Sequence, residues 1–196
     1  MSPKETLRGK IKKNLAQIPK EEFGTQGACA AALLCNSPLW SACKTVFIFL
    51  STHGEIDTRP LLETALREGK TVFAPKLGAD KETSSKLAFH PVLGPDGPWS
   101  VGPFGIRQPL GGRTPEEEDF PALIITPGLA FDREGSRLGR GKGYYDRFFA
   151  ELDAENKHYT AIGFCMDFQL VPLVPTGKND KKVNGLVTGK ELVTLK

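Results

Sequence analysis

One stretch of the 196-residue chain, residues 123–149, constrains the fold more than any other. It opens with a short apolar run whose size and β-branched content are typical of a buried strand, and Pro127 ends that strand. A loop rich in glycine and arginine follows, with Lys142 near its end. The loop glycines are Gly128, Gly135, Gly139, Gly141 and Gly143, and the arginines are Arg133, Arg137 and Arg140. The apolar residues after the loop have the spacing of one helix face: Tyr145, Phe148, Phe149 and Leu152.

A strand, a cationic glycine-rich loop and a helix, in this order, are suited to binding phosphate. Glycines let backbone N–H groups approach an anion closely, the helix N-terminus adds partial positive charge, and Lys and Arg supply full charges. The loop is not a Walker A motif, because Ser136 replaces its first glycine and Gly143 replaces its hydroxyl residue. It also lacks the glycine spacing and the acidic residue of a dinucleotide-binding fingerprint. The sequence therefore predicts an unusual phosphate site with Asp146 just inside the helix.

The rest of the chain alternates between apolar runs and helical patterns, which predicts an α/β fold. Strands are expected at residues 45–50, 70–74, 87–90, 123–125, 160–164 and 183–187, with Pro75 ending the second. Helices are expected after a capping box formed by Ser2 and Glu5, at residues 26–34, after an N-cap at Thr58, and from residue 145. This alternation implies a mostly parallel sheet with helices on both faces. No linker or repeat divides the sequence, so residues 1–196 are expected to form a single domain.

Two segments outside the loop carry candidate ligand contacts. Lys4 and Arg8 are four residues apart, so they project from the same side of the first predicted helix. Glu55 lies in the loop that follows the strand at residues 45–50, and such loops form the ligand crevice of open α/β sheets. From the residues alone, Lys4 and Arg8 could equally form a solvated cationic face, and Glu55 a surface turn.

Composition bears on the class of partner. A hydrophobic content of 39% is ordinary for a globular protein, and Trp99 and Phe104 are expected in its core. No apolar run approaches the roughly 18–20 residues of a membrane span, and no apolar signal core is present, so a cytoplasmic location is expected. The net charge of +3 suits a nucleotide as well as RNA, but no RNA-binding signature occurs. We expect a monomer that acts on a small molecule, without nucleic acid or membrane.

A family resemblance sharpens this interpretation. The sequences PGLAFD at residues 127–132 and RLGRGKGYYD at residues 137–146, with Gly135 between them, closely resemble the signature of 5-formyltetrahydrofolate cyclo-ligases. These enzymes are also called 5,10-methenyltetrahydrofolate synthetases. The resemblance extends to residues 4–8, residues 51–58 and the pair Asn179-Asp180, so it covers most of the chain. It implies an enzyme that uses ATP and Mg²⁺ to convert 5-formyltetrahydrofolate into 5,10-methenyltetrahydrofolate, ADP and phosphate.

The resemblance also implies roles for individual residues. The ATP-binding residues would be Lys4, Arg8, Arg137, Leu138, Gly139, Arg140, Gly141, Lys142, Gly143, Tyr144 and Tyr145. The folate-binding residues would be Leu50, Glu55, Arg140, Gly141, Lys142, Gly143 and Tyr144. In this set, Glu55 would pair with the amino and N–H donors of the pterin ring. Lys142 is the first choice for stabilising the transition state, together with Arg140 and Tyr144. Asp146 and Asp180 would bind Mg²⁺, which prefers carboxylate oxygens, although an Asn-Asp pair taken alone could be a simple turn.

Phosphorylation of the formyl oxygen would make the formyl group a better electrophile and its oxygen a better leaving group. Such a step depends on positioning and charge neutralisation and needs no protein nucleophile. Two alternatives remain open from the sequence. One is a catalytically inactive cyclo-ligase-like module that contacts RNA or protein through its basic loop, and the other is an enzyme of sugar phosphates or another ATP-dependent reaction. The complete set of candidate residues argues against the first alternative, and Glu55, which sugar phosphates do not need, argues against the second.

Overall fold

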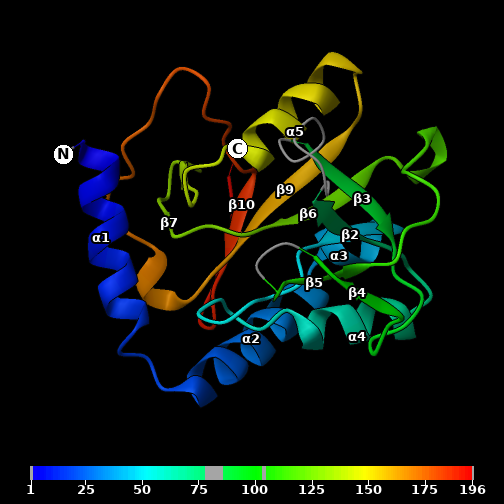
Figure 1. Ribbon diagram of the computed structural model, residues 1–196, viewed down its shortest axis with the longest axis horizontal. Helices are drawn as coiled ribbons and strands as arrows, with labels where there is room; N and C mark the ends of the chain where they lie inside the picture. Colours follow the sequence, from blue (N-terminus) through cyan, green and yellow to red (C-terminus); the bar gives the residue numbers. More distant parts are fainter. Residues whose placement is uncertain (1, 78–85, 103–104, 196) are drawn as a thin grey trace.

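The computed structural model describes residues 2–77, 86–102 and 105–195, and a seven-stranded sheet lies at its centre (Figure 1). The strands are β1 (Thr45–Ile48), β2 (Thr71–Leu77), β3 (Leu87–Pro91), β6 (Ala122–Thr126), β9 (Tyr159–Phe164), β10 (Gly185–Val187) and β11 (Leu192–Thr194). They are arranged in the order β11-β10-β9-β6-β1-β2-β3. All neighbours from β10 to β2 pair in parallel, whereas β3 and β11 are antiparallel strands at the two edges. The predicted α/β fold with a mostly parallel sheet is therefore confirmed.

Helices cover both faces of this sheet, as predicted. They are α2 (Lys20–Cys35), α3 (Pro38–Ala42) and α4 (Arg59–Arg67) on one face and α5 (Tyr144–Ala154) on the other. Every residue of β1 is buried, and successive side chains point to opposite faces. Val46 and Ile48 pack with α2, α3 and α4, whereas Phe47 packs with the apolar side of α5. That side of α5 is the predicted one: Tyr145, Phe148, Phe149 and Leu152 are all buried.

The N-terminal helix α1 (Pro3–Leu15) lies at one side of the molecule, away from the sheet (Figure 1). Ser2 and Glu5 form the predicted capping box at its start. Its buried residue Ile11 packs in a separate small cluster with Leu129, Ala130, Leu138 and Val174. Two of these belong to a short hairpin of β7 (Ala130–Phe131) and β8 (Arg137–Leu138). Helix α1 is thus attached mainly to the glycine-rich loop, and only its last residue, Leu15, also packs against the main core.

Pro75 does not end β2, contrary to the prediction. Strand β1 pairs with β2 only as far as Phe73, so that side of β2 has no partner strand beyond this residue. The Leu77 N–H points away from β3 and donates to the Gln108 side chain, and Pro75 has the same orientation two residues earlier. The missing N–H of Pro75 therefore removes no hydrogen bond of the β2–β3 ladder.

Other boundaries also differ from the sequence prediction. Helix α2 begins at Lys20, β10 begins at Gly185, and the strands β4 (Trp99–Val101), β5 (Arg107–Pro109) and β11 were not predicted. Thr58 does precede α4, but its hydroxyl donates to the Phe49 carbonyl at 2.8 Å instead of capping the helix. Trp99 packs against the main core, while Phe104 lies outside the described residues. Within the described residues, no helix has the length and apolar character needed to cross a membrane.

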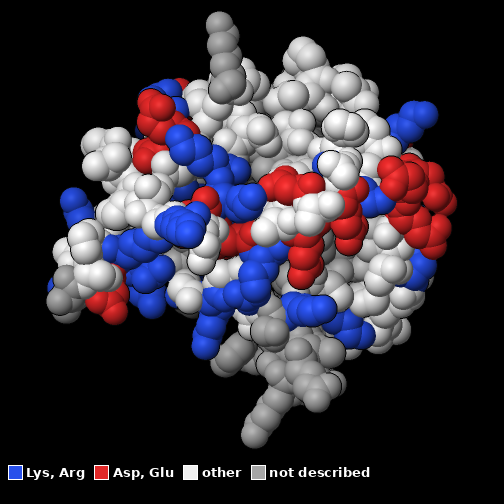
Figure 2. Space-filling view, turned by 90° about the horizontal axis from the view of Figure 1, so that it is seen from above, with Lys and Arg blue, Asp and Glu red and all other residues white. Residues whose placement is uncertain are grey.

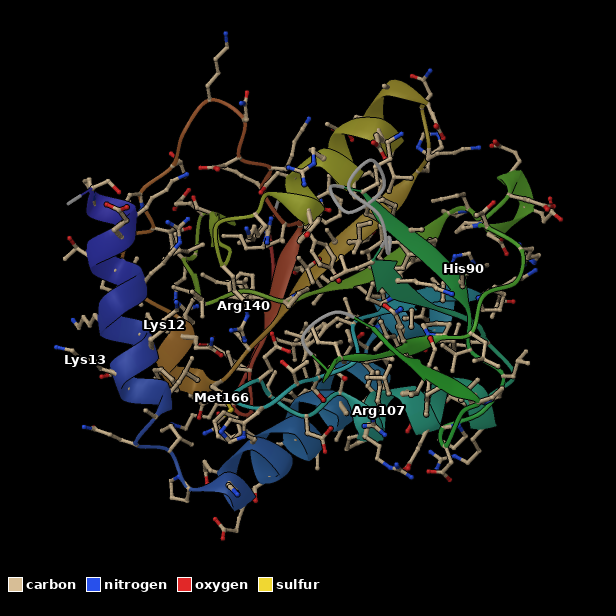
Figure 3. All side chains as sticks on the ribbon, viewed as in Figure 1. Lys12, Lys13, His90, Arg107, Arg140 and Met166 are labelled. Carbon is tan, nitrogen blue, oxygen red and sulfur yellow. The ribbon has the colours of Figure 1, made fainter. Side chains whose placement is uncertain are left out.

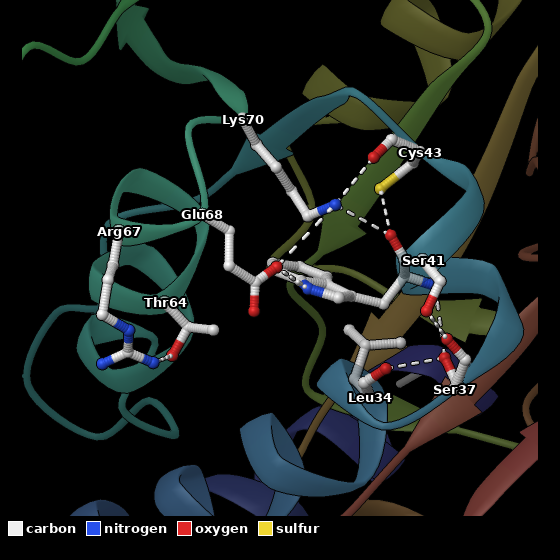
Figure 4. A network of polar contacts seen from close by, with 9 residues as sticks. Leu34, Ser37, Ser41, Cys43, Thr64, Arg67, Glu68 and Lys70 are labelled. Atoms are coloured by element: carbon white, nitrogen blue, oxygen red, sulfur yellow. Dashed lines mark hydrogen bonds and ion pairs between the residues drawn. The ribbon is translucent and has the colours of Figure 1, made fainter.

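A partly buried lysine, Lys70, joins α3 to the corner between α4 and β2 (Figure 4). Lys70 donates hydrogen bonds to the carbonyls of Trp40 and Cys43, at 2.9 and 2.8 Å, where α3 ends. The ammonium also lies 4.9 Å from the centre of the Trp40 ring. The indole of Trp40 in turn donates to Glu68 at 2.7 Å. These contacts add donors to the carbonyls at the end of the short helix, and they link α3 to the amino ends of β1 and β2.

Candidate active site

The order of the parallel strands places the candidate site. From β1 the chain adds β2 and then β3 on one side of the sheet. The strands from β6 onward lie on the other side of β1. In open α/β sheets, ligands bind beside the carboxyl ends of the strands at such a switch point. Here the loop at residues 49–58 follows β1, and the glycine-rich loop at residues 127–143 follows β6. Both loops line a narrow cavity of about 10 Å³, together with Phe164 and Gln169.

The loop after β1 presents Glu55 on a tight turn. Glu55 N donates to the Thr52 carbonyl at 3.0 Å, and Gly54, the third residue of the turn, has φ 78°. That positive φ is the feature of a type II turn, and glycine adopts it without steric cost. The base of the loop is closed by Ser51, whose N–H and hydroxyl contact Thr58. Glu55 is therefore held at a defined place rather than on a freely solvated turn.

Arg140 joins the two loops. Its Nε and Nη2 donate to Oε1 of Glu55 at 3.3 and 2.9 Å, although the two residues are 85 positions apart. The side chain of Glu55 is 18% exposed and that of Arg140 is 52% exposed. Figure 3 shows Arg140 between α1 and the central strands. The structure thus brings together Arg140, which is proposed to bind phosphate, and Glu55, which is proposed to bind the pterin.

The glycine-rich loop ends in a backbone conformation that only glycine adopts easily. Gly141 has φ 107° and Gly143, the N-cap of α5, has φ 66°. A β-carbon at Gly141 would also lie 3.6 Å from the guanidinium carbon of Arg8. These conformations leave the first N–H groups of α5 directed into the loop, where the helix dipole favours an anion. The strand, glycine-rich loop and helix that the sequence predicted as a phosphate site therefore follow one another as expected.

Helix α1 contributes Lys4 and Arg8 to the same place. Arg8 Nε donates to the Gly139 carbonyl at 3.0 Å, and Lys4 forms an ion pair with Asp180. Partial burial acts to raise the pKa of Asp180, but hydrogen bonds from Lys4 and the Gly177 amide outweigh it and lower that pKa. The two cations that the sequence placed on one side of a helix both face the site. They do not form a separate solvated face.

Asp146 is held by an ion pair with Arg137. The guanidinium donates to Oδ1 of Asp146 at 2.8 Å and lies 5.6 Å from the centre of the Tyr145 ring. The side chain of Arg137 is 4% exposed, so it lies beneath the loop, unlike an open phosphate ligand. Oδ1 also accepts the N–H of Lys181 at 3.2 Å, which brings the segment containing Asp180 next to Asp146. The two predicted metal ligands therefore lie close together.

The residues predicted to bind nucleotide at positions 137–145 divide into a buried group and a partly or fully exposed group. Leu138 and Tyr145 are buried like Arg137, so in this conformation their side chains belong to the core. Lys142 is exposed, and its ammonium forms no ion pair with any described residue. Its carbonyl accepts a hydrogen bond from Arg147 at 2.9 Å. Figure 2 shows Lys and Arg side chains gathered on the side of α1, next to Asp and Glu side chains near the centre of that face.

Comparison with known proteins identifies the family. A model of the 5-formyltetrahydrofolate cyclo-ligase family matches residues 1–189. The chain belongs to this family. It is 31% identical to the 5-formyltetrahydrofolate cyclo-ligase of Mus musculus, over 93% of this chain and 92% of that protein. It is also 29% identical to a probable cyclo-ligase of Schizosaccharomyces pombe, over 97% of each chain.

The fold agrees with this assignment. The solved structure of Aquifex aeolicus 5,10-methenyltetrahydrofolate synthetase superposes with a TM-score of 0.81 at 31% identity. It covers 99% of this chain and 93% of the Aquifex chain. The resemblance inferred from residues 127–146 is thus confirmed at the level of the whole chain.

Three polar residues that sequence reasoning did not single out support the loops of the candidate site. Thr52 donates two hydrogen bonds to Glu55, and buried Asp132 accepts three backbone N–H groups around the glycine-rich loop. The amide of buried Gln169 donates to the carbonyls of Gly128 and Leu129, each at 3.0 Å. For Thr52 and Asp132, the pattern of a polar residue followed by glycine two or three positions later was a usable turn signal. Gln169 had no comparable local signal.

Proposed function

We propose that this protein catalyses the ATP- and Mg²⁺-dependent cyclisation of 5-formyltetrahydrofolate to 5,10-methenyltetrahydrofolate, with release of ADP and phosphate. The contact between Arg140 and Glu55 carries the proposal. It joins the loop suited to phosphate with the loop suited to a pterin, at the switch point of the sheet. The reaction requires this proximity, because the γ-phosphate must reach an oxygen of the folate.

The reaction divides into two displacements. In the first, the formyl oxygen attacks the γ-phosphorus and the bond to the bridging oxygen breaks, which releases ADP. In the second, N10 attacks the formyl carbon and loses its proton, and the C–O bond breaks to release phosphate. Lys142 and the N–H groups at the start of α5 would stabilise the charge on the transferring group. Arg8, Lys4 and Arg140 would add cationic contacts along the nucleotide.

The folate would lie between the two loops. Glu55 would accept hydrogen bonds from the pterin, and half-buried Leu50, in the loop after β1, would supply an apolar contact. Tyr144 lies at the first position of α5, beside the glycine-rich loop and close to the expected formyl group. We further propose that residues 1–196 act as one domain and that a monomer suffices, because every proposed contact comes from one chain.

The carboxylates of Asp146 and Asp180 would hold Mg²⁺. Oδ1 of Asp146 accepts hydrogen bonds from Arg137 and Lys181. Oδ2 lies at the end of the glycine-rich loop, 4.0 Å from where a β-carbon on Gly143 would be. No cluster of three or more metal-binding side chains occurs among the described residues. Two carboxylates fit Mg²⁺, which usually combines one or two of them with water and substrate phosphates. The ion would neutralise charge on the phosphate oxygens.

Replacing Asp146 with Asn is expected to raise the Mg²⁺ concentration for half-maximal turnover at least about 10-fold, because the amide is a weaker ligand. The measurement is a Mg²⁺ titration of turnover at saturating ATP and folate. Asp153→Asn is the matched control, because Asp153 lies two turns later on α5 and pairs with Lys181 at the surface. Equal Mg²⁺ titrations for Asp146→Asn and wild type would remove Asp146 from the metal site.

Turnover tests the proposed function directly. Purified protein is mixed with 5-formyltetrahydrofolate, ATP and Mg²⁺, and the near-ultraviolet absorbance of the methenyl product is followed. We expect an increase that requires all three components. Absence of product from folded protein that still binds ATP would overturn the proposal.

A further inference from the structure

The hydrogen-bonding capacity of Glu55 is fully used in the structure. A carboxylate offers about four lone-pair positions, two on each oxygen. Thr52 fills those of Oε2 with its N–H and its hydroxyl, each at 2.9 Å. Arg140 fills those of Oε1 with Nε and Nη2. A pterin can therefore bind Glu55 only if one of these partners leaves.

The two partners of Glu55 differ in how firmly they are held. Thr52 and Glu55 are the first and fourth residues of one turn, closed by the hydrogen bond from Glu55 N to the Thr52 carbonyl. The loop base at Ser51 and Thr58 fixes this turn, and so does the N–H of Asp57, which donates to the Phe23 carbonyl at 3.1 Å. Arg140 instead reaches Glu55 from another loop on a long side chain that is 52% exposed. An exposed ion pair of this kind contributes little stability.

Arg140 is accordingly the partner that can leave Glu55 when ligands bind. Phosphate groups bound in the glycine-rich loop would attract its guanidinium, and the pterin would take its place at Oε1 of Glu55. Thr52 would keep its contacts with Oε2 throughout. Without the hydroxyl, Oε2 would keep only the N–H of Thr52, and the carboxylate would turn more widely about its terminal torsion, which has a broad energy minimum.

We propose that Thr52 is a positioning residue for folate binding, which acts by fixing the carboxylate of Glu55. This inference rests on the proposed function, because it takes Glu55 as the pterin contact. It concerns one step only, the recognition of folate, and leaves the binding of nucleotide unaffected. Thr52 and Glu55 also line a surface hollow between their loop and the start of α2, together with the neighbouring side chain of His53.

Thr52→Val tests this role, since valine keeps the shape of threonine and removes only the hydroxyl. We expect the KM for 5-formyltetrahydrofolate to rise about 10-fold, the effect of losing one hydrogen bond to a charged group. The KM for ATP should stay within about twofold of wild type and kcat within about threefold. Thr52→Ser keeps the hydroxyl, so its folate KM should stay within about threefold of wild type.

Ser51→Ala is the matched control for a looser loop. Ser51 is the adjacent residue, and its hydroxyl contacts Asp57 and Thr58 rather than Glu55. We expect its folate KM to change much less than that of Thr52→Val. A folate KM within twofold of wild type in Thr52→Val would overturn the inference. So would an increase shared by Thr52→Ser, by Ser51→Ala or by the KM for ATP. Failure of the proposed function itself is recognised separately, because wild-type protein would then form no product.

Discussion

Replacing Lys142 with Ala is expected to lower kcat about 100- to 1,000-fold, the usual effect of removing one group that stabilises transition-state charge. Lys142 is the exposed cation of the glycine-rich loop whose ammonium forms no ion pair with a described residue, so it is available to phosphate. Because its side chain has no packing role, the free energy of unfolding should change by less than about 0.5 kcal/mol. Steady-state turnover and urea unfolding measure the two quantities.

Two further variants make the Lys142 result specific. Lys13→Ala removes an exposed lysine from α1, on the side of that helix opposite Arg140 (Figure 3), and should leave kcat near the wild-type value. Lys142→Arg keeps the charge but changes its shape, so it should recover part of the lost rate. Near-wild-type turnover of Lys142→Ala would rule out the proposed role.

Replacing Asp132 with Ala is expected to lower the free energy of unfolding by about 3 kcal/mol or more. Asp132 is fully buried. Its Oδ1 accepts the N–H groups of Glu134 and Ser136, at 3.1 and 2.9 Å, and its Oδ2 accepts that of Val174 at 2.9 Å. Removal of the carboxylate would leave these donors without an acceptor, and two of them, the N–H groups of Ser136 and Val174, belong to buried residues. Denaturant unfolding followed by circular dichroism measures the change.

Glu134→Ala is the matched control for Asp132, because Glu134 is an exposed acidic residue of the same turn. It should change stability by less than about 0.5 kcal/mol. Asp132→Asn should lie between the two, because the amide oxygen can serve the N–H groups of one side while its NH₂ group opposes another N–H. If Asp132→Ala is as stable as Glu134→Ala, the buried carboxylate does not hold the loop.

Asp132 also shows how the site depends on tertiary structure. The carboxylate connects the β7–β8 hairpin with the segment at residues 174–181, which carries Asp180 and Lys181. The same hairpin supports α1 through Leu138 and Ile11. One buried side chain therefore stabilises the loop to which two other segments of the site, residues 174–181 and α1, are attached. Its loss is expected to disturb nucleotide and metal contacts together.

Local sequence was sufficient where local forces decide the structure. The spacing of Tyr145, Phe148 and Phe149 predicted the buried side of α5, because helical geometry alone brings those positions together. The capping box at Ser2 and Glu5 formed as expected for the same reason. The failure at Pro75 is equally physical: a proline ends a strand only where its N–H is needed, and the extent of β1 decides that.

The sequence by itself determined the α/β fold, the family and the identity of the candidate residues, because these depend on periodicity and on short motifs. Only the tertiary structure decided how the charges combine. Each proposed ligand-binding carboxylate is paired with a cation from a different segment: Glu55 with Arg140, Asp146 with Arg137, and Asp180 with Lys4. The pairs Glu55–Arg140 and Lys4–Asp180 join residues 85 and 176 positions apart in the chain, so no local pattern predicts them. They follow from the switch point of the sheet, where parallel strands bring the ends of distant loops to one edge.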